Sequence, residues 1–306
     1  GVPANVLHLL PGSGDAVGAR LVADPRIAGV AFTGSTETAR AIARSLAGRE
    51  GPMVPLIAET GGQNALIVDS SALPEQVVAD VLASAYNSAG QRCSALRVLF
   101  VQDDVAPDMI DMIAGAMAEL RVGPPRFLDT DVGPVIDAAA LAVLESHAAR
   151  MTRAGKLVAE TPVPPDLPPG TYFAPRAFEI DGIGRLEREV FGPILHIVRY
   201  GGAHLDRVIA AINGTGYGLT LGIHSRIDGT IDHILRHARV GNAYVNRNQI
   251  GAVVGVQPFG GEGLSGTGPK AGGPRYLHRF ATERVVSVNT TAAGGNAALM
   301  TLEGDE

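Results

Sequence analysis

The sequence predicts an α/β protein whose sheets are mainly parallel. Apolar runs of strand length alternate along the chain with segments of helical pattern, which is the alternation that βαβ units produce. Several helical segments have an acid in the first turn or a glycine just past the last residue, as helix ends prefer. With 306 residues, 46% of them hydrophobic, the chain is long enough for one large or two ordinary domains with a real core.

The expected elements follow one another in order. Strands are expected at residues 29–33, 64–69, 96–101, 195–199, 219–223 and 243–246. Helices are expected at residues 36–46, 74–88, 107–120, 139–153, 205–212 and 230–238. The proline-rich stretch at 161–170 is typical of a surface loop. We expect one further strand at 283–289, beyond the glycine-rich loop at 259–274.

The first part of the chain holds too few elements for a complete domain. One or two strand–helix pairs precede Glu59, whereas a dinucleotide-binding sheet needs more. We therefore expect a further part of the polypeptide upstream of residue 1.

The composition excludes several classes of function. The net charge is −6 and no run is rich in Lys or Arg, so the sequence predicts no positively charged surface that would bind nucleic acid. No apolar stretch reaches the ~20 residues of a membrane-spanning helix. Cys93 is the single cysteine, which excludes an internal disulfide and a multi-cysteine zinc site. We expect a cytoplasmic protein that acts on a small molecule without a metal.

Cys93 is the first candidate for chemistry. It follows a helix that Gly90 ends and precedes the strand at 96–101, in a loop where a nucleophile would be exposed. The alternative is a buried small apolar residue, which a lone cysteine often is. The polar neighbours Gln91, Arg92 and Ser94 favour the loop, and Arg92 would stabilise a thiolate if its charge pointed inward.

Two glutamates are the next candidates. Glu59 lies between apolar residues and the glycine turn at 61–62, so its carboxylate should be partly desolvated. Desolvation raises a carboxyl pKa toward a value useful for a general base, although an acid that caps the turn fits the local sequence equally well. Glu189 has a similar alternative, because Glu187 and Glu189 flank Arg188 and would form a solvated charge cluster.

The segment 31–37 is a strand that enters a tight turn and then a helix. Gly34 would let a ligand approach the backbone, and Ser35 at the helix start would either cap the helix or meet a phosphate. On this segment alone, the cap is the simpler interpretation.

Together these pieces resemble the aldehyde dehydrogenase superfamily over residues 1 to about 290. Its motifs occur in the family's order and spacing, at residues 32–35, 59–62, 90–93, 189–193 and 258–261. Within the superfamily the sequence looks most like the glutamate-semialdehyde (pyrroline-5-carboxylate) dehydrogenase branch, in particular the dehydrogenase half of the bifunctional proline utilization A enzymes. Three details point there: Thr60 with Gln63, Ser94 directly after the cysteine, and the loop at 265–274.

The resemblance implies an activity and a set of site residues. The activity is NAD-dependent oxidation of L-glutamate γ-semialdehyde to L-glutamate in proline catabolism, through a thiohemiacetal and then a thioester on Cys93. Glu59 would activate the water that hydrolyses the thioester. The resemblance also implies cofactor contacts from Gly34, Ser35, Glu189 and Phe191, and substrate contacts from Ser94, Gly272, Gly273 and Phe259.

The resemblance also implies a domain organisation. Residues 1–58 would be the last part of an NAD-binding domain, residues 59–266 the catalytic domain, and residues 267–306 the substrate-anchor loop and oligomerisation tail. A strand at 282–289 would cross to the neighbouring subunit of a homodimer, although an ordinary edge strand fits equally well. The family's asparagine that donates to the oxyanion and its lysine that contacts the adenine ribose would lie upstream of residue 1. The choice between NAD and NADP therefore stays open. A bifunctional parent would carry FAD in its other domain.

Two alternatives stay open at this point. The chain is either a dehydrogenase for another acid-bearing aldehyde, such as succinate semialdehyde, or a non-catalytic module. Such a module would supply half a site or an interaction surface to a longer polypeptide or a second subunit.

Overall fold

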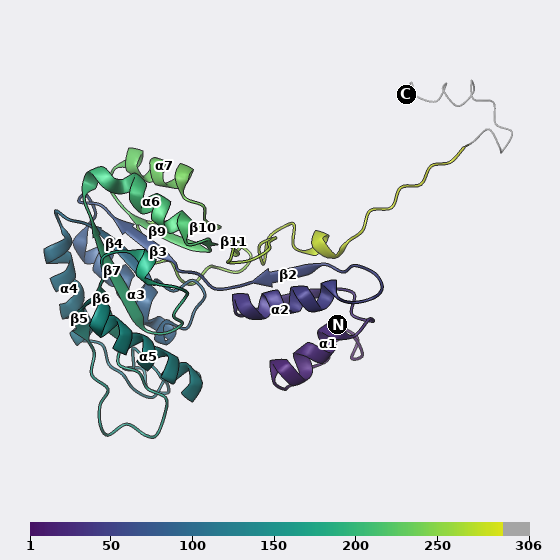
Figure 1. Ribbon diagram of the computed structural model, residues 1–306, viewed down its shortest axis with the longest axis horizontal. Coiled ribbons are helices and arrows are strands. Elements are labelled where there is room, and N and C mark those ends of the chain that lie inside the picture. Colours follow the sequence, from purple (N-terminus) through teal and green to yellow (C-terminus); the bar gives the residue numbers. More distant parts are fainter. Residues whose placement is uncertain (290–306) are drawn as a thin grey trace.

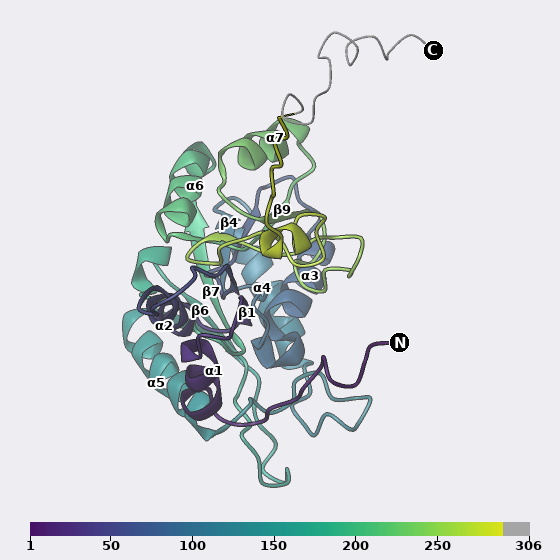
Figure 2. The same ribbon diagram turned by 90° about the vertical axis from the view of Figure 1, so that its right-hand side faces the viewer.

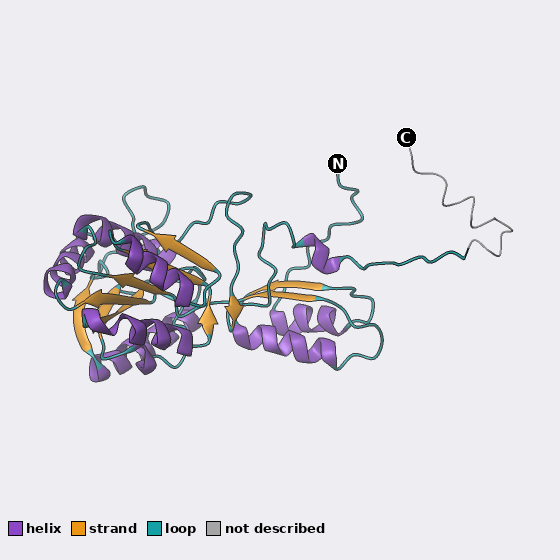
Figure 3. Ribbon diagram, turned by 90° about the horizontal axis from the view of Figure 1, so that it is seen from above, coloured by secondary structure: helices purple, strands orange, loops and turns teal. Residues whose placement is uncertain are grey.

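The protein was analysed as a computed structural model, which describes residues 1–289. Figures 1 and 3 show a larger lobe built on one sheet and a smaller lobe that contains the first strands and helices of the chain. The sheet of the larger lobe has seven strands in the order β10-β9-β3-β4-β7-β6-β5. No helix within residues 1–289 combines the length and apolarity needed to cross a membrane.

The seven-stranded sheet is parallel except at one edge. Only β5 runs antiparallel to its neighbour, β6, whereas all other adjacent pairs are parallel. The central strands are almost entirely apolar and buried, as strands covered on both faces should be. The strands are β3 (Ala65–Val68), β4 (Val98–Gln102), β5 (Lys156–Glu160), β6 (Arg176–Glu179), β7 (Ile194–Tyr200), β9 (Thr220–His224) and β10 (Asn242–Val245).

Helices cover both sides of this sheet (Figure 2). Parallel strands need crossover connections, and α3 supplies the one between β3 and β4. Its residues Val77 and Val81 are fully buried in the core. The helices of this lobe are α3 (Pro74–Tyr86), α4 (Ala106–Ala118), α5 (Ala138–Ala154), α6 (Leu205–Gly214) and α7 (Asp228–His237).

The smaller lobe contains two parallel strands, β1 (Val30–Thr33) and β2 (Leu56–Glu59). They accompany α1 (Ala19–Ala23) and α2 (Thr36–Ala47). The last strand of this lobe, β2, leads through residues 60–64 directly into β3 at the centre of the large sheet. A short antiparallel ribbon of β8 (Tyr217–Gly218) and β11 (Glu262–Gly263) completes the sheets.

The structure confirms the expected fold class and all six strands and six helices expected before residue 250, with small differences at their ends. The loop at 161–170 contains no helix or strand, as expected. The sequence did not predict α1, β2, β5, β6, β8 or β11. These elements are short, and several carry charged residues that hide the apolar pattern.

The strand expected at 283–289 is wrong for the single chain, because residues 283–289 form no helix or strand. This segment leads away from both lobes in Figure 1, and Val285, Val286 and Val288 are exposed. A strand forms only where its backbone groups pair with a neighbour, and this segment extends beyond the sheets. The remaining part of the expected tail lies outside the described residues.

Two buried histidines join α5 to the sheet. Arg150 donates from Nη2 to His147 Nδ1 (2.9 Å), and His147 Nε2 lies 2.9 Å from His196 Nε2. His196 Nδ1 lies 3.0 Å from the Arg97 carbonyl oxygen. Because the arginine can only donate and the carbonyl can only accept, one tautomer of each ring satisfies the chain, and both rings are neutral. Burial lowers the pKa of His147 to about 4 and that of His196 to about 3.

We expect this pair to make stability depend on pH. A histidine in the unfolded chain has a pKa of about 6.5. Below that pH the unfolded chain therefore binds protons, whereas the two folded rings stay neutral. The free energy of unfolding should be constant above about pH 6.5 and fall as the pH drops toward 4. The slope should be up to about 1.4 kcal/mol per pH unit for each extra proton. Urea unfolding between pH 7.5 and 4.5 measures it.

The control is His147→Gln, which keeps a donor toward His196 and removes one titrating ring. Its slope should be shallower than that of the wild-type chain. Equal slopes in the two proteins would show that other groups cause the pH dependence.

Candidate active site

One cavity brings together most of the residues that the sequence singles out. It has a volume of about 520 Å³, and its wall includes Gly34, Ser35, Glu59, Cys93, Glu189 and Phe191. These residues come from the β1–α2 turn, the end of β2, the loop before β4 and the loop before β7. A second cavity of about 540 Å³ lies between α1, β1 and α2 and has mostly apolar walls.

Glu59 is the last residue of β2, beside Thr33 of β1. Burial raises the pKa of its carboxyl to about 7, against the opposing effects of the Gly261 N–H and the Lys270 charge. Both carboxylate oxygens are buried, and among the described residues neither has a hydrogen-bond partner of normal geometry. The predicted desolvation of Glu59 is confirmed. A carboxyl that titrates near pH 7 can take up and release a proton under physiological conditions.

The loop that carries Cys93 begins with an unusual backbone. Ser88, Ala89 and Gly90 have φ values of 58°, 52° and 63°, all in the left-handed region. A non-glycine residue there costs about 1–2 kcal/mol, so Ser88 and Ala89 hold this conformation only because their surroundings impose it. Asn64 fixes the other side of the loop, donating from Nδ2 to the carbonyl oxygens of Cys93 (2.6 Å) and Ala95 (2.9 Å).

Cys93 is neither a core residue nor fully exposed, since its accessibility is intermediate. The pKa of its thiol is raised, first by burial and then by the negative charge of Glu189, while the charge of Arg97 opposes the rise. The thiol is therefore the resting form at neutral pH. Attack on a carbonyl carbon requires a proton acceptor close by.

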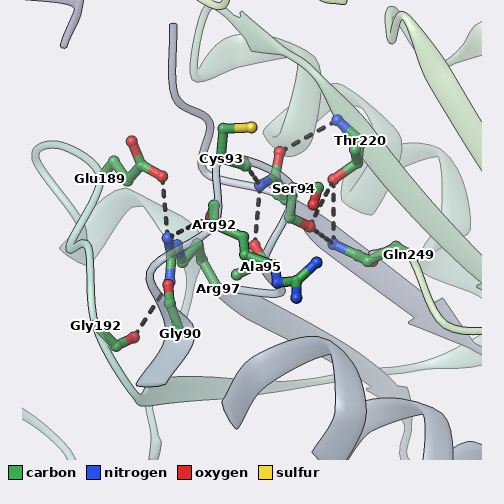
Figure 4. Close-up of polar contacts among 11 residues, drawn as sticks. Gly90, Arg92, Cys93, Ser94, Ala95, Arg97, Glu189, Gly192, Thr220 and Gln249 are labelled. Carbon is green, nitrogen blue, oxygen red and sulfur yellow. Dashed lines mark hydrogen bonds and ion pairs between the residues drawn. The ribbon is translucent and has the colours of Figure 1, made fainter. Parts of the chain in front are cut away.

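The positive charge that acts on the thiol comes from Arg97 and not from Arg92. The exposed Arg92 side chain turns back and donates from Nε to Ser88 Oγ (2.9 Å), so the condition under which Arg92 would stabilise a thiolate is not met. The Arg97 side chain is buried and lies against the loop (Figure 4). Sequence reasoning missed Arg97, although an arginine inside the apolar run at 96–101 is a signal, because a buried charge needs partners.

Glu189 is partly buried and forms an ion pair with Arg97, with 3.2 Å between Oε1 and Nη2. The alternative of a solvated cluster with Glu187 and Arg188 is therefore wrong. Burial raises the pKa of Glu189, whereas Arg97 and the Gly62 N–H act against the rise. A Cβ atom on Gly61 would lie 1.6 Å from Glu189 Oε2, so this approach of backbone to carboxylate requires glycine.

The β1–α2 turn forms the opposite wall of the cavity. Ser35 is the N-cap of α2, since its Oγ accepts a hydrogen bond from the Thr38 N–H (3.1 Å). The cap is confirmed, while contact between Ser35 and a ligand stays a prediction. A Cβ atom on Gly34 would lie 2.4 Å from Phe32 Cζ, so a side chain there would displace the ring.

The four predicted substrate residues do not line this cavity. Ser94 is 6% exposed, and its carbonyl oxygen accepts from Thr220 Oγ1 (3.2 Å) and Gln249 Nε2 (3.3 Å). Phe259 pairs with Ala271 in an isolated antiparallel bridge. The Gly273 N–H donates to the Lys270 carbonyl oxygen (3.1 Å).

That last contact corrects the expected cradle of two free N–H groups at residues 272 and 273. In this conformation the turn uses the Gly273 N–H internally. Only the Gly272 N–H remains as a candidate for a substrate carboxylate.

Tyr217 is a further wall residue that the sequence did not suggest. Burial raises the pKa of its hydroxyl, next to Glu189 and Thr36. A tyrosine at the start of a short ribbon carries no signal in the sequence. Within residues 1–289, no cluster of three or more His, Cys, Asp or Glu side chains is placed to hold a metal ion.

Comparisons with known proteins show the family of the chain. The model of the "Aldehyde dehydrogenase family" matches residues 1–286. The chain is 56% identical over 300 residues to "Bifunctional protein PutA" of Salmonella typhimurium, covering 95% of this chain and 23% of that protein. It is 35% identical over 292 residues to "1-pyrroline-5-carboxylate dehydrogenase" of Geobacillus thermodenitrificans, covering 94% of this chain and 56% of that protein. The chain therefore spans about a quarter of the length of the bifunctional relatives.

Solved structures show the same relationship. A crystal structure of "bifunctional proline utilization A (PutA) protein" superposes with a TM-score of 0.91 at 60% identity, covering 96% of this chain and 30% of that one. A "1-Pyrroline-5-Carboxylate Dehydrogenase from Thermus with bound NAD" superposes with a TM-score of 0.85 at 35% identity, covering 92% of this chain and 54% of that one. The chain belongs to the aldehyde dehydrogenase family.

Proposed function

We propose that this chain carries the catalytic residues for NAD-dependent oxidation of L-glutamate γ-semialdehyde to L-glutamate, a step of proline catabolism. The observation that carries the proposal is the cavity in which Cys93, a glutamate that titrates near pH 7, and Glu189 face the β1–α2 turn. The names of the relatives support the choice of substrate, and the bound NAD of the Thermus structure supports the choice of cofactor.

The proposal extends to the organisation of the whole protein. Residues 1–58 would belong to the cofactor domain, 59–266 to the catalytic domain, and 267–306 to the anchor loop and tail. We propose a cytoplasmic homodimer in which an upstream part of the polypeptide completes the cofactor site. FAD would belong to another part of a bifunctional enzyme and not to this segment.

The residues present fit a dinucleotide. The α2 helix has 12 residues, and its N-terminus points free backbone N–H groups at the cavity beside Ser35, an arrangement that suits a pyrophosphate. Gly34 and Gly61 also line the cavity, where their lack of a side chain leaves the backbone accessible to a ligand. Gly34 and Ser35 would hold the pyrophosphate, and Glu189 with Phe191 would hold the nicotinamide riboside. When bound, NAD accepts a hydride.

The protein supplies the remaining chemistry. Glu59 takes the proton of the Cys93 thiol, and the thiolate sulfur forms a bond to the aldehyde carbon. The Cys93 backbone N–H donates to the oxygen that becomes negative. After oxidation the acyl group is a thioester on Cys93. Glu59 releases the first proton to solvent and then takes a proton from water as the water oxygen attacks the thioester carbon. The carbon–sulfur bond breaks, the sulfur takes up a proton from Glu59, and glutamate is released.

Recognition of the substrate would come from its α-carboxylate. A short aldehyde acid offers little apolar area, so hydrogen bonds to its charge must supply most of the specificity. We propose that Ser94 and Gly272 contact this carboxylate, with Phe259 and Gly273 shaping the anchor loop. Succinate semialdehyde remains the alternative substrate, because the same donors would suit any aldehyde of similar length that carries an acid.

The first prediction concerns the base. In the complete natural polypeptide, Glu59→Gln should still form one equivalent of NADH, although more slowly because Glu59 also accepts the Cys93 proton. Steady-state turnover should slow by ~100-fold or more, since a general base contributes about 10²–10⁴-fold. Stopped-flow absorbance of NADH at excess aldehyde measures both phases. An unchanged steady-state rate would remove Glu59 from the mechanism.

The second prediction follows from the pKa of Glu59, which lies at about 7. Only the ionised carboxylate can accept a proton, so thioester hydrolysis should speed up as the pH rises through about 7 and then level off. Single-turnover hydrolysis of the acyl-enzyme between pH 5.5 and 9 tests this. A profile without this inflection, or the same inflection in Glu59→Gln, would assign the titration to another group.

The third prediction concerns specificity. Ser94→Ala removes a hydrogen bond to a charged group, worth ~1.5–3 kcal/mol, and should lower kcat/KM for glutamate semialdehyde roughly 10- to 150-fold. An uncharged aldehyde of similar length should lose much less. Ser88→Ala, the same change on the same loop, is the control. If both aldehydes suffer equally, the glutamate assignment falls while the dehydrogenase assignment survives.

A further inference from the structure

Arg97 is a buried cation that the proposed reaction does not use. It lies one residue before β4, and its side chain is 2% exposed. Its guanidinium contacts two segments that are distant in the sequence, residues 90–92 and residues 189–192. Figure 4 shows the group between them.

The contacts to the first segment tie down the loop that leads to Cys93. Nη1 donates to the Gly90 carbonyl oxygen (2.7 Å), and Nη2 donates to the Arg92 carbonyl oxygen (3.0 Å). Gly90 ends the left-handed run that begins at Ser88, and Arg92 immediately precedes Cys93. The two arms of one planar group thus fix the carbonyls on both sides of Gln91.

The contacts to the second segment reach the predicted cofactor residues. Nη1 also donates to the Gly192 carbonyl oxygen (3.2 Å), and Nη2 pairs with Glu189 Oε1 (3.2 Å). The guanidinium carbon lies 5.2 Å from the centroid of the Phe191 ring. A Cβ atom on Gly90 would lie 2.3 Å from the Gly192 carbonyl oxygen, so the two segments touch directly beside the arginine.

A single guanidinium is suited to this arrangement. Its donors point in fixed directions in one plane, whereas a lysine ammonium is a compact point charge on a flexible stem. A buried charge persists where several acceptors surround it, and Arg97 has three carbonyls and one carboxylate. Neither Arg92 nor Arg188, both exposed, can replace it.

We propose that Arg97 is a positioning residue that ties the Cys93 loop to the 189–192 segment. It thereby keeps the Cys93 thiol and the Glu189 carboxylate in one fixed arrangement. This inference rests on the proposed function for its consequence in catalysis. Its physical content, the tethering of one loop to another, is independent of any substrate.

The first experiment measures the tether without aldehyde or cofactor. Hydrogen exchange of the Gln91 and Ala95 amides reports on the loop, because they donate to the carbonyl oxygens of Ser88 (2.9 Å) and Arg92 (3.0 Å). Both Arg97→Lys and Arg97→Met should exchange these amides at least about tenfold faster than wild type, measured under native conditions. The matched control is Arg199→Met on β7, which loses a surface ion pair with Glu179 and should leave the loop unchanged.

The second experiment separates the charge of Arg97 from its bulk. Iodoacetamide labelling in the complete polypeptide is measured on the peptide that contains Cys93, the single cysteine of these 306 residues. Loss of Arg97 would also let Glu189 take up a proton, so the comparison is made in a Glu189→Gln background. There, Arg97→Met should move the pH profile of labelling upward, with about threefold slower labelling below its midpoint, whereas Arg97→Lys should keep the profile of the background.

The outcomes are distinct. Faster loop exchange in both variants, with the pH profile moved only by the methionine, supports the proposal. If Arg97→Met fails to fold, the exchange of Arg97→Lys decides alone. Unchanged exchange in a folded Arg97→Lys, or equal acceleration in Arg199→Met, would overturn the proposal. Because neither measurement involves turnover, such a result would leave the proposed dehydrogenase activity standing.

Discussion

The buried ion pair between Arg97 and Glu189 links the parts of this site. Two charges removed from water need hydrogen bonds to offset their lost hydration. Here three backbone carbonyls, the Gly62 N–H and the pair itself supply them, with only Arg97 Nε left without a partner among the described residues. One of these contacts fixes the Gly90 carbonyl oxygen, directly after Ser88 and Ala89, whose left-handed backbone is costly for residues other than glycine. One guanidinium thus joins the loop that carries Cys93 to the segment that carries Glu189.

Burial shifts two titratable groups of this site toward their uncharged forms. Burial raises the pKa of Glu59 to about 7, and burial with the Glu189 charge raises that of the Cys93 thiol. A protein that exposed a thiolate permanently would react with any electrophile. Glu59 and Cys93 line one cavity, and in the proposed mechanism a proton moves from the thiol to the carboxylate.

Much of the fold could be predicted from the sequence, because buried parallel strands such as Ala65–Val68 read as apolar runs and their crossover helices have clear ends. The site residues Cys93, Glu59 and Glu189 were found through motifs, since local sequence left each with an alternative. Tertiary contacts decided the rest. The charge of Arg97 acts on the thiol whereas Arg92 turns back to Ser88, the Gly273 N–H is used within its own turn, and residues 283–289 form no strand. No local pattern specifies these contacts, because each depends on residues far away in the chain.

The central claim is that Cys93 forms a covalent acyl intermediate with the substrate in this cavity. Acid quenching of the complete polypeptide during its first turnover with NAD and glutamate semialdehyde, followed by peptide mapping by mass spectrometry, tests it directly. We expect a glutamyl group linked through its γ-carbonyl on the peptide that contains Cys93, in an amount that matches the NADH formed. NADH formation without an adduct on that peptide, or with an adduct on another residue, would contradict the account.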